Sequence, residues 1–263
     1  MTTPTPLDLA HEAMEAAPGD AAARLRFYER LADAELFLLL EKEAGDDSIA
    51  PEIFDTSDAR FVLVFDTEAR LSHFVNRIAP YAALSGRAIA AMLSGQNIGL
   101  AVNPEVAPSA ILIPPQAVGW LADTLTHAPD QVEARITGMT APAGLPESLI
   151  TALDAKLSTA AGLADWAGLV GVTYDNGARS HLLGFVNAVP AARAALAGAV
   201  NEALTFSGLE AAALDVGFFS ADDPVTTRLG RAGLRFDLPE PAQPADYVPA
   251  PPGSDPAKPP KLR

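Results

Sequence analysis

The segment Asp58–Leu71, DARFVLVFDTEARL, decides how the first half of the chain folds. Within it, the short apolar run RFVLVFD at Arg60–Asp66 predicts a buried strand. Asp66 or Thr67 can cap a helix that begins directly after this strand. The apolar residues that follow recur at helical spacing and give that helix one face for the core, namely Leu71, Phe74, Val75 and Ile78.

Further strands and helices are predicted on both sides of this segment. Glu35–Lys42 holds five consecutive apolar residues, Leu36 to Leu40, and predicts a second buried strand. The other strand predictions are Asn97–Val102, Ala110–Ile113 and Gln131–Met139. The helix predictions are Leu7–Ala16, Ala21–Ala34, Ser85–Leu93 around Gly86, and a helix that starts at Pro115.

A linker to a second domain is predicted at Thr140–Pro146, because two prolines and a glycine make this stretch short and stiff. After a helix near 147–161, Gly168–Tyr174 and Ser180–Val189 predict a β-hairpin. Asn176-Gly177 between them suits a two-residue type I′ turn, since Asn and Gly tolerate positive φ best. This turn sets Tyr174 opposite Arg179 and Val172 opposite His181.

The rest of the second half continues as helix, strand, helix and strand. The predicted elements are a helix from Pro190 to Gly208, a strand at Ala213–Phe219, a helix capped by Asp222-Asp223-Pro224, and a strand at Leu234–Leu238. We therefore expect an α/β (α+β) protein with two small domains, 20–139 and 147–238, each a mixed sheet with helices packed on it. Residues 239–263 are rich in proline and are expected to form a disordered tail.

The composition excludes several classes of partner and chemistry. The net charge is −15 and no basic stripe is present, which argues against nucleic acid and against an anionic membrane surface as ligands. The chain has no cysteine, which removes disulfides, thiolate metal sites and thiol nucleophiles. The start of the sequence lacks the basic and apolar regions of a secretory signal. A basic protein partner, or no partner, fits this charge better.

No catalytic, nucleotide-binding or metal motif is found. G-x-S-x-G, the Walker-type P-loop and G-x-G-x-x-G are all absent. None of the four histidines (His11, His73, His127 and His181) shares a metal-binding spacing with another. Asp222-Asp223 could be a catalytic carboxylate pair, but acids directly before Pro224 are more typical of a helix cap. We expect no enzyme activity, no cofactor and no metal site.

The first half resembles the SseB amino-terminal domain. The residues that carry this resemblance are Leu25–Leu40, Asp58–Leu71, the Gly86-Arg87 helix and Asn97–Pro104 (NIGLAVNP). In the family, a strand ending in phenylalanine leads through a Thr/Ser turn into a helix, which Phe65 and Thr67 match, and a G-[LI]-x-[VI]-N-P strand follows, which Gly99 to Pro104 match. The second half, about Glu147–Leu238, resembles the family's carboxy-terminal domain through its order of elements. Physically, the matching residues act as fold determinants rather than as reactive groups, and they are Phe65, Thr67, Gly86, Gly99, Asn103 and Pro104.

The resemblance implies a cytoplasmic bacterial protein and no known reaction. Our leading hypothesis is a non-enzymatic adaptor or regulatory protein that binds another cytoplasmic protein. The alternative is a sensor that binds an amino-acid-like metabolite in a pocket between the domains. A sensor requires polar groups that converge on a pocket, whereas an adaptor requires an exposed apolar patch rimmed by charge.

Overall fold

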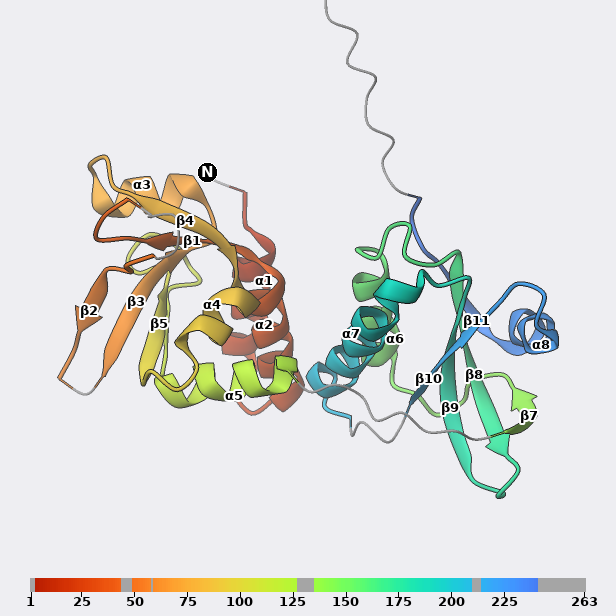
Figure 1. Cartoon of the computed structure of the whole chain (residues 1–263). Coiled ribbons are helices and arrows are strands. Elements are labelled where there is room, and N and C mark those ends of the chain that lie inside the picture. The colour runs from red at the N-terminus through yellow and green to blue at the C-terminus, as the bar shows by residue number, and fades with distance from the viewer. Residues whose placement is uncertain (1–2, 44–48, 58, 127–134, 210–213, 241–263) are drawn as a thin grey trace, which may run out of the picture.

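The protein forms two lobes, each a mixed β-sheet with helices packed against it, in the computed structural model (Figure 1). The structure describes residues 3–43, 49–57, 59–126, 135–209 and 214–240. The expected α/β class with two mixed sheets is therefore confirmed. The Pro-rich tail, apart from Pro239 and Glu240, lies outside the described residues, as do His127 and most of the acidic loop before Ile49.

The first sheet has the strand order β4-β1-β3-β5-β6, and β2 pairs with β3 beside this path. Its strands are β1 (Glu35–Leu39), β2 (Ile53–Asp55), β3 (Arg60–Phe65), β4 (Tyr81–Ser85), β5 (Ile98–Val102) and β6 (Ile111–Ile113). β3 and β5 run parallel, while the other pairs are antiparallel. β3 and β5 lie at the centre and are almost wholly buried, as their continuous apolar runs indicate.

Helices cover the two faces of the first sheet unequally (Figure 1). One face is packed by α1 (Pro6–Ala16), α2 (Ala21–Asp33), α4 (Gly86–Leu93) and α5 (Pro115–Thr126), around a core that includes Phe27, Leu31 and Ile89. The other face is contacted by a single short helix, α3 (Glu68–Val75), at one end of the sheet. This asymmetry leaves part of the second face without a helix among the described residues.

One prediction about α3 is wrong, and the strand that follows it was not predicted. Thr67 caps α3 as expected, but the helix ends at Val75 because Asn76 takes a left-handed conformation (φ 46°) that ends its hydrogen-bond ladder. Ile78 is therefore fully exposed instead of packing on the helix's inner face. The strand β4 was not expected at all, since Tyr81–Ser85 is short and half exposed, with no clear alternation.

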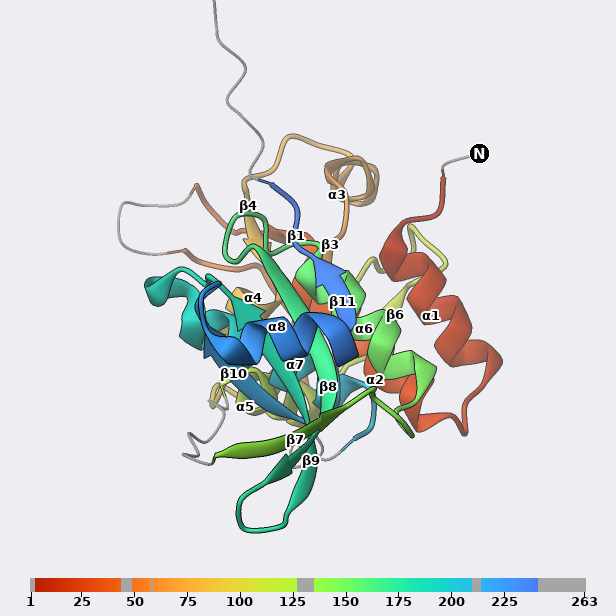
Figure 2. The ribbon, with the colours of Figure 1, turned by 90° about the vertical axis from the view of Figure 1, so that its right-hand side faces the viewer.

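The second sheet has the strand order β10-β9-β8-β11, and β7 also pairs with β8. Its strands are β7 (Ile136–Thr140), β8 (Trp166–Tyr174), β9 (Arg179–Val186), β10 (Asp215–Phe219) and β11 (Leu234–Asp237). α6 (Glu147–Leu157) and α7 (Arg193–Phe206, after a 3₁₀ turn at Pro190–Ala192) pack on one face. α8 (Pro224–Ala232) lies across the other face, as Figure 2 shows.

The expected register of the hairpin β8–β9 is wrong by one residue. Thr173, not Tyr174, lies opposite Arg179, and Val172 lies opposite Ser180. The turn is one residue longer than a two-residue type I′ turn, because the Tyr174 N–H donates to the backbone oxygen of Ala178 and leaves residues 175–177 between them. Only Gly177 takes a positive φ (81°), whereas type I′ needs it at both central positions. The Asn176 side chain instead accepts a hydrogen bond from the backbone of Ala178.

The lobes also divide the chain differently from the expected boundaries. β7 pairs antiparallel with β8, so residues 136–139 belong to the second sheet although the first domain was expected to extend to residue 139. The first lobe begins before residue 20, because α1 packs on α2 and buries Leu7 in the first core. Sequence pattern cannot assign a short strand such as β7 to a sheet, since that depends on which strand it pairs with.

An aromatic contact joins the lobes. Phe206, at the end of α7, is fully buried in the core of the first lobe. Its ring makes a T-shaped contact with Trp120 on α5, and Trp120 makes another with Tyr28 on α2. We call these three rings the aromatic seam. The seam holds α7 against α2 and α5, and so brings charged side chains of the two lobes close to one another.

Candidate functional site

Gly86 and Gly99 lie where the backbone of one element approaches another too closely for a side chain. A Cβ at Gly86 would lie 1.8 Å from the backbone oxygen of Leu31, because the start of α4 packs directly on the end of α2. A Cβ at Gly99 would lie 2.4 Å from the backbone oxygen of Ile113 and 2.7 Å from the Phe61 ring. Both positions therefore act on packing, with no reactive group involved.

The other residues of the family motif gather at the carboxyl ends of β3 and β5. Phe65 is the buried last residue of β3, and the Thr67 side chain accepts a hydrogen bond from the Arg70 backbone as the cap of α3. Asn103 is fully buried with a φ of 47°, and Pro104 follows it in the turn after β5. The Asn103 side chain accepts from the backbone N–H of Asp66 (3.1 Å) and donates to the Ser109 hydroxyl (2.9 Å).

A buried ion network extends from Asn103 to the first helix. Ser109 donates to the carboxylate of Asp8, and Arg70 binds Asp8 and Asp66 at 2.5 and 2.7 Å. Burial alone would raise the pKa of Asp8, but hydrogen bonds from Arg70 and Ser109 hold it well below the usual range. No buried side-chain nitrogen or oxygen among the described residues lacks a partner. The network thus anchors α1 and leaves no polar group free for a ligand.

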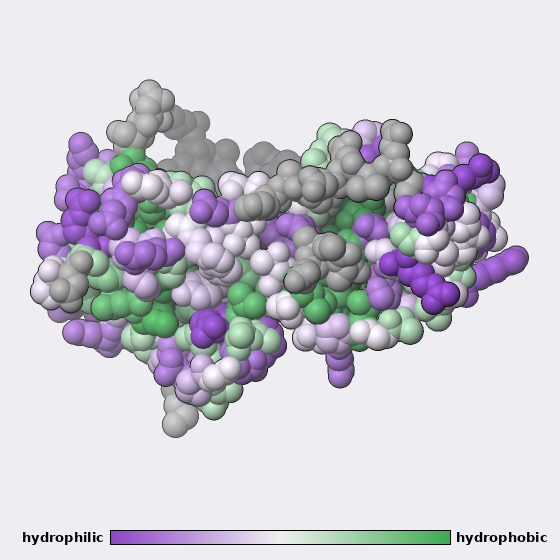
Figure 3. Space-filling view, turned by 90° about the horizontal axis from the view of Figure 1, so that it is seen from below, coloured by the Kyte–Doolittle hydropathy of each residue, from purple (hydrophilic) through white to green (hydrophobic). Residues whose placement is uncertain are grey.

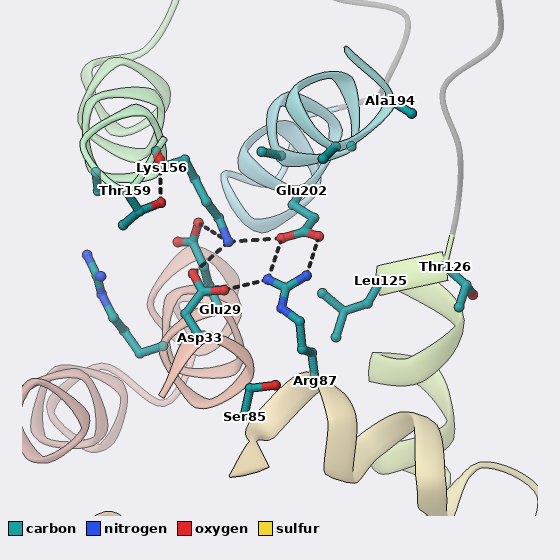
Figure 4. A pocket seen from close by; sticks show the side chains of 15 residues that line it. Glu29, Asp33, Ser85, Arg87, Leu125, Thr126, Lys156, Thr159, Ala194 and Glu202 are labelled. Atoms are coloured by element: carbon teal, nitrogen blue, oxygen red, sulfur yellow. Dashed lines mark hydrogen bonds and ion pairs between the residues drawn. The ribbon is translucent and has the colours of Figure 1, made fainter. Parts of the chain in front are cut away.

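A second charged cluster, which we call the interlobe cluster, joins the lobes (Figure 4). Its five side chains come from α2, α4, α6 and α7, and they are Glu29, Asp33, Arg87, Lys156 and Glu202.

Lys156 is the centre of the interlobe cluster. Its side chain is 8% exposed, and its ammonium group lies 2.6 Å from Asp33, 2.9 Å from Glu202 and 3.8 Å from Glu29. The Arg87 guanidinium binds both oxygens of Glu202, at 2.9 and 3.0 Å, and also binds Asp33. Since Lys156 and Glu202 belong to the second lobe, these ion pairs clamp the lobes together.

The acids of the interlobe cluster differ in the direction in which their pKa is shifted. Burial disfavours the charge of each carboxylate. Arg87 and Lys156 overcome this at Asp33 and Glu202 and lower the pKa of both. At Glu29, burial outweighs the attraction of Lys156, and the nearby carboxylates add to it, so the pKa is raised. Glu29 is therefore the acid whose negative charge fits the cluster least well.

A pocket of about 740 Å³ opens beside the interlobe cluster. The charged residues form one wall, together with the hydroxyls of Ser85 and Thr159, whereas Thr126 lies beside Leu125. The other wall is apolar and built from small residues of α7 and one leucine of α5, namely Ala194, Ala195, Gly198, Ala199 and Leu125. Such a pocket can take a small molecule that carries both charged and apolar groups.

The open face of the first sheet is the second candidate surface. Paired residues of neighbouring strands point to the same side of a sheet, which places Phe54 beside Phe61 and Leu112 beside Ala101 on the face that α3 only partly covers. Phe54 and Leu112 are 51% and 52% exposed. Hydrophobic patches lie among hydrophilic side chains on both lobes in the view of Figure 3. We call the set Phe54, Phe61, Leu63, Ala101 and Leu112 the open face.

The structure also shows the surroundings of the other residues that the sequence suggested as candidate sites. Asp223 caps α8 by accepting from the backbone of Val225, as expected, and Asp222 is exposed before it. His11 packs edge-on against Phe27, and His181 contacts the backbone oxygen of Ala143. Within the described ranges, no group of three metal-ligating side chains is found. Over the same ranges, no helix has the length and apolar character needed to span a membrane.

No pattern in the sequence predicted the interlobe cluster or the Asp8 network. Glu29 and Asp33 have the ordinary spacing of a solvated helix face, and Lys156 lies more than one hundred residues away from them. Arg87 is the exception, because it directly follows the motif glycine Gly86. Among the motif residues, the structure brings Phe65, Thr67 and Asn103 together and leaves Gly86 at the interlobe cluster, apart from them.

One comparison with known proteins identifies part of the chain. Residues 11–120 match the family model described as SseB protein N-terminal domain. This range runs from the second half of α1 into α5 and covers the first sheet, so the resemblance of the first half is confirmed. The likeness of the second lobe to the family's carboxy-terminal domain stays a prediction. No curated protein and no solved structure matches the chain.

Proposed function

We propose that this chain, which belongs to the SseB family through its domain at residues 11–120, is a non-enzymatic cytoplasmic adaptor that binds another protein. The open face carries this proposal. It combines exposed Phe54 and Leu112 with a floor of nearly buried Phe61 and Leu63. Exposed apolar residues over a rigid sheet are a typical surface for protein association.

The charge of the molecule favours a protein over other macromolecular partners. The net charge of −15 repels phosphate backbones and anionic lipid surfaces. It also speeds the approach of a basic protein by long-range attraction. The partner we expect is therefore a protein with a basic surface around an apolar centre.

An affinity pull-down of the tagged full-length chain at moderate salt, read by mass spectrometry, tests this proposal. We expect a stoichiometric partner that is lost from the double variant Phe54→Ser/Leu112→Ser. Both side chains are about half exposed, so their replacement should leave the fold intact. Leu234→Ser is the matched control, because Leu234 is an exposed leucine on a strand of the second lobe.

The pull-down can either support or contradict the adaptor proposal. A partner that binds the Leu234→Ser variant and a chain without residues 241–263, but not the double variant, supports the adaptor proposal. A partner that binds all variants equally, or no partner, contradicts it.

A metabolite sensor is the second candidate, and the pocket beside the interlobe cluster favours it. Acids and bases converge there next to an apolar wall, which suits a zwitterion such as an amino acid. The test is a thermal-shift screen of the full chain with amino acids. A ligand that raises the melting temperature of the wild type but not of Arg87→Ala supports the sensor, since Arg87 is a half-exposed cation that lines the pocket.

A further inference from the structure

β2 is a strand whose residues are all exposed, although two of them are large and apolar. Ile53 and Phe54 are 38% and 51% exposed, and they point to opposite sides of the strand. Among the described residues, β2 pairs only with β3, through Ile53–Val62, Phe54–Phe61 and Asp55–Arg60. Its other edge therefore presents backbone N–H and C=O groups without a neighbouring strand.

Proteins usually protect such an edge from pairing with other chains. Common devices are a very short strand, a charged side chain (especially lysine), a proline within the strand, a bulge or a covering helix. β2 is short and carries the charge of Asp55, but it has no lysine and no proline within it, and no described helix lies over it. An extended segment can add to an edge of this kind through main-chain hydrogen bonds, with its alternate side chains contacting the two faces.

The charge around β2 indicates the kind of segment that would bind. The described residues that flank or form β2 include four acids and one lysine, namely Glu41, Glu43, Glu52, Asp55 and Lys42. Of these, Glu41, Glu43 and Asp55 are exposed, whereas Glu52 has Arg77 as a partner at 3.6 Å. Arg60 on β3 is the register partner of Asp55. An incoming strand would thus meet a mainly acidic surface.

We propose that the outer edge of β2 binds an extended, lysine- or arginine-rich segment of another protein by strand addition. This inference rests on the proposed adaptor function and names the chemistry of the partner. A second copy of the chain fits poorly, because two acidic stretches would then face each other. The chain's own basic end fits poorly as well, because Pro256, Pro259 and Pro260 lack the N–H that pairing requires.

A synthetic peptide of alternating lysine and valine, with blocked ends and seven residues, is the probe for this edge. The comparison peptide has proline in place of the central valine, which keeps the charge and removes strand pairing. Binding of the fluorescently labelled peptides to the full chain is measured by anisotropy. We expect the proline peptide to bind at least about tenfold more weakly, which corresponds to about 1.4 kcal/mol.

Two variants of the chain locate the peptide. Asp55→Lys should weaken binding several-fold, whereas Asp237→Lys should leave it unchanged. Asp237 is the matched control because it is an exposed acid at the end of β11, an edge strand of the second sheet. Equal binding of both peptides, equal loss in both variants, or no binding at millimolar concentration would overturn the proposal. Dimerisation of the chain without peptide binding would instead assign the edge to a second copy and would also overturn it.

This proposal and the adaptor proposal can fail separately. A pulled-down partner that is lost from Phe54→Ser/Leu112→Ser but retained by Asp55→Lys would keep the adaptor function and remove strand addition. Absence of any partner would count against the adaptor function, whatever the peptides do.

Discussion

At the scale of single residues, close backbone contacts decide which substitutions the fold tolerates. Gly86 is the clearest case, because its missing side chain lets α4 begin directly against the backbone of Leu31. The family resemblance predicted that Gly86 is important for the fold. It could not show the contact, since Leu31 lies more than fifty residues away and meets Gly86 only in the folded lobe.

Gly86→Ala should therefore lower the free energy of unfolding by about 3 kcal/mol, because rigid backbone cannot yield to the new Cβ. Urea denaturation measures the change. Gly119→Ala on α5 is the control, since nothing lies within 4 Å of its Cβ position and a helical alanine should stabilise by up to about 1 kcal/mol. Equal effects in both variants would show that the contact with Leu31 does not constrain Gly86.

Asp8 should make the stability of the first lobe sensitive to acid. The pKa of Asp8 in the folded chain lies below its ordinary value of 3.8, so its ionised form contributes stability above about pH 4. That contribution is lost as the pH falls further and the carboxylate becomes protonated. Asp8→Asn should be less stable at neutral pH and should lose less stability between about pH 4 and pH 2. Denaturation curves across this range that stay parallel to the wild type would rule this out.

At the scale of elements, the sequence predicted what local pattern controls. The strands β1, β3, β5 and β6 and the start of α3 were expected from apolar runs and caps, and all are present. The end of α3, the strand β4 and the register of β8–β9 were missed. Each of these depends on a left-handed residue or on a pairing partner, and neither is visible in a short window of sequence.

The cap of α3 gives a direct test at this scale. Thr67→Ala removes the oxygen that accepts from the Arg70 backbone and should cost about 1 kcal/mol. Thr67→Ser keeps that oxygen and should restore most of the loss in the same urea titration. Failure of serine to restore stability would mean that the Thr67 methyl group, rather than the cap, matters.

At the scale of the whole molecule, the aromatic seam and the interlobe cluster hold the two lobes together. The members of the interlobe cluster are remote in sequence, and the apolar anchor Phe206 lies on a helix of the other lobe. Periodicity indicated that Leu196, Val200 and Leu204 face the core of the second lobe, as they do. It could not indicate that the same helix also contacts the first lobe.

Two isosteric variants of the cluster should act in opposite directions at pH 7. Glu202→Gln should destabilise the chain by about 2 kcal/mol, since the lowered pKa of Glu202 means that its charge is favourable in the folded state. Glu29→Gln should stabilise it, because the raised pKa of Glu29 means that its charge is costly there. Unfolding free energies at pH 7 that change in the same direction for both variants would contradict this account of the cluster.

The central claim is that the open face of the first sheet binds a protein while the lobes stay clamped. Hydrogen exchange of the full chain, with and without the partner captured in the pull-down, tests it most directly. We predict slower exchange in β2, β3 and β6 on binding and no change in α6 and α7. Slower exchange confined to the α6 and α7 segments that line the pocket, or no change in β2, β3 and β6, would contradict the claim and favour the pocket as the site of function.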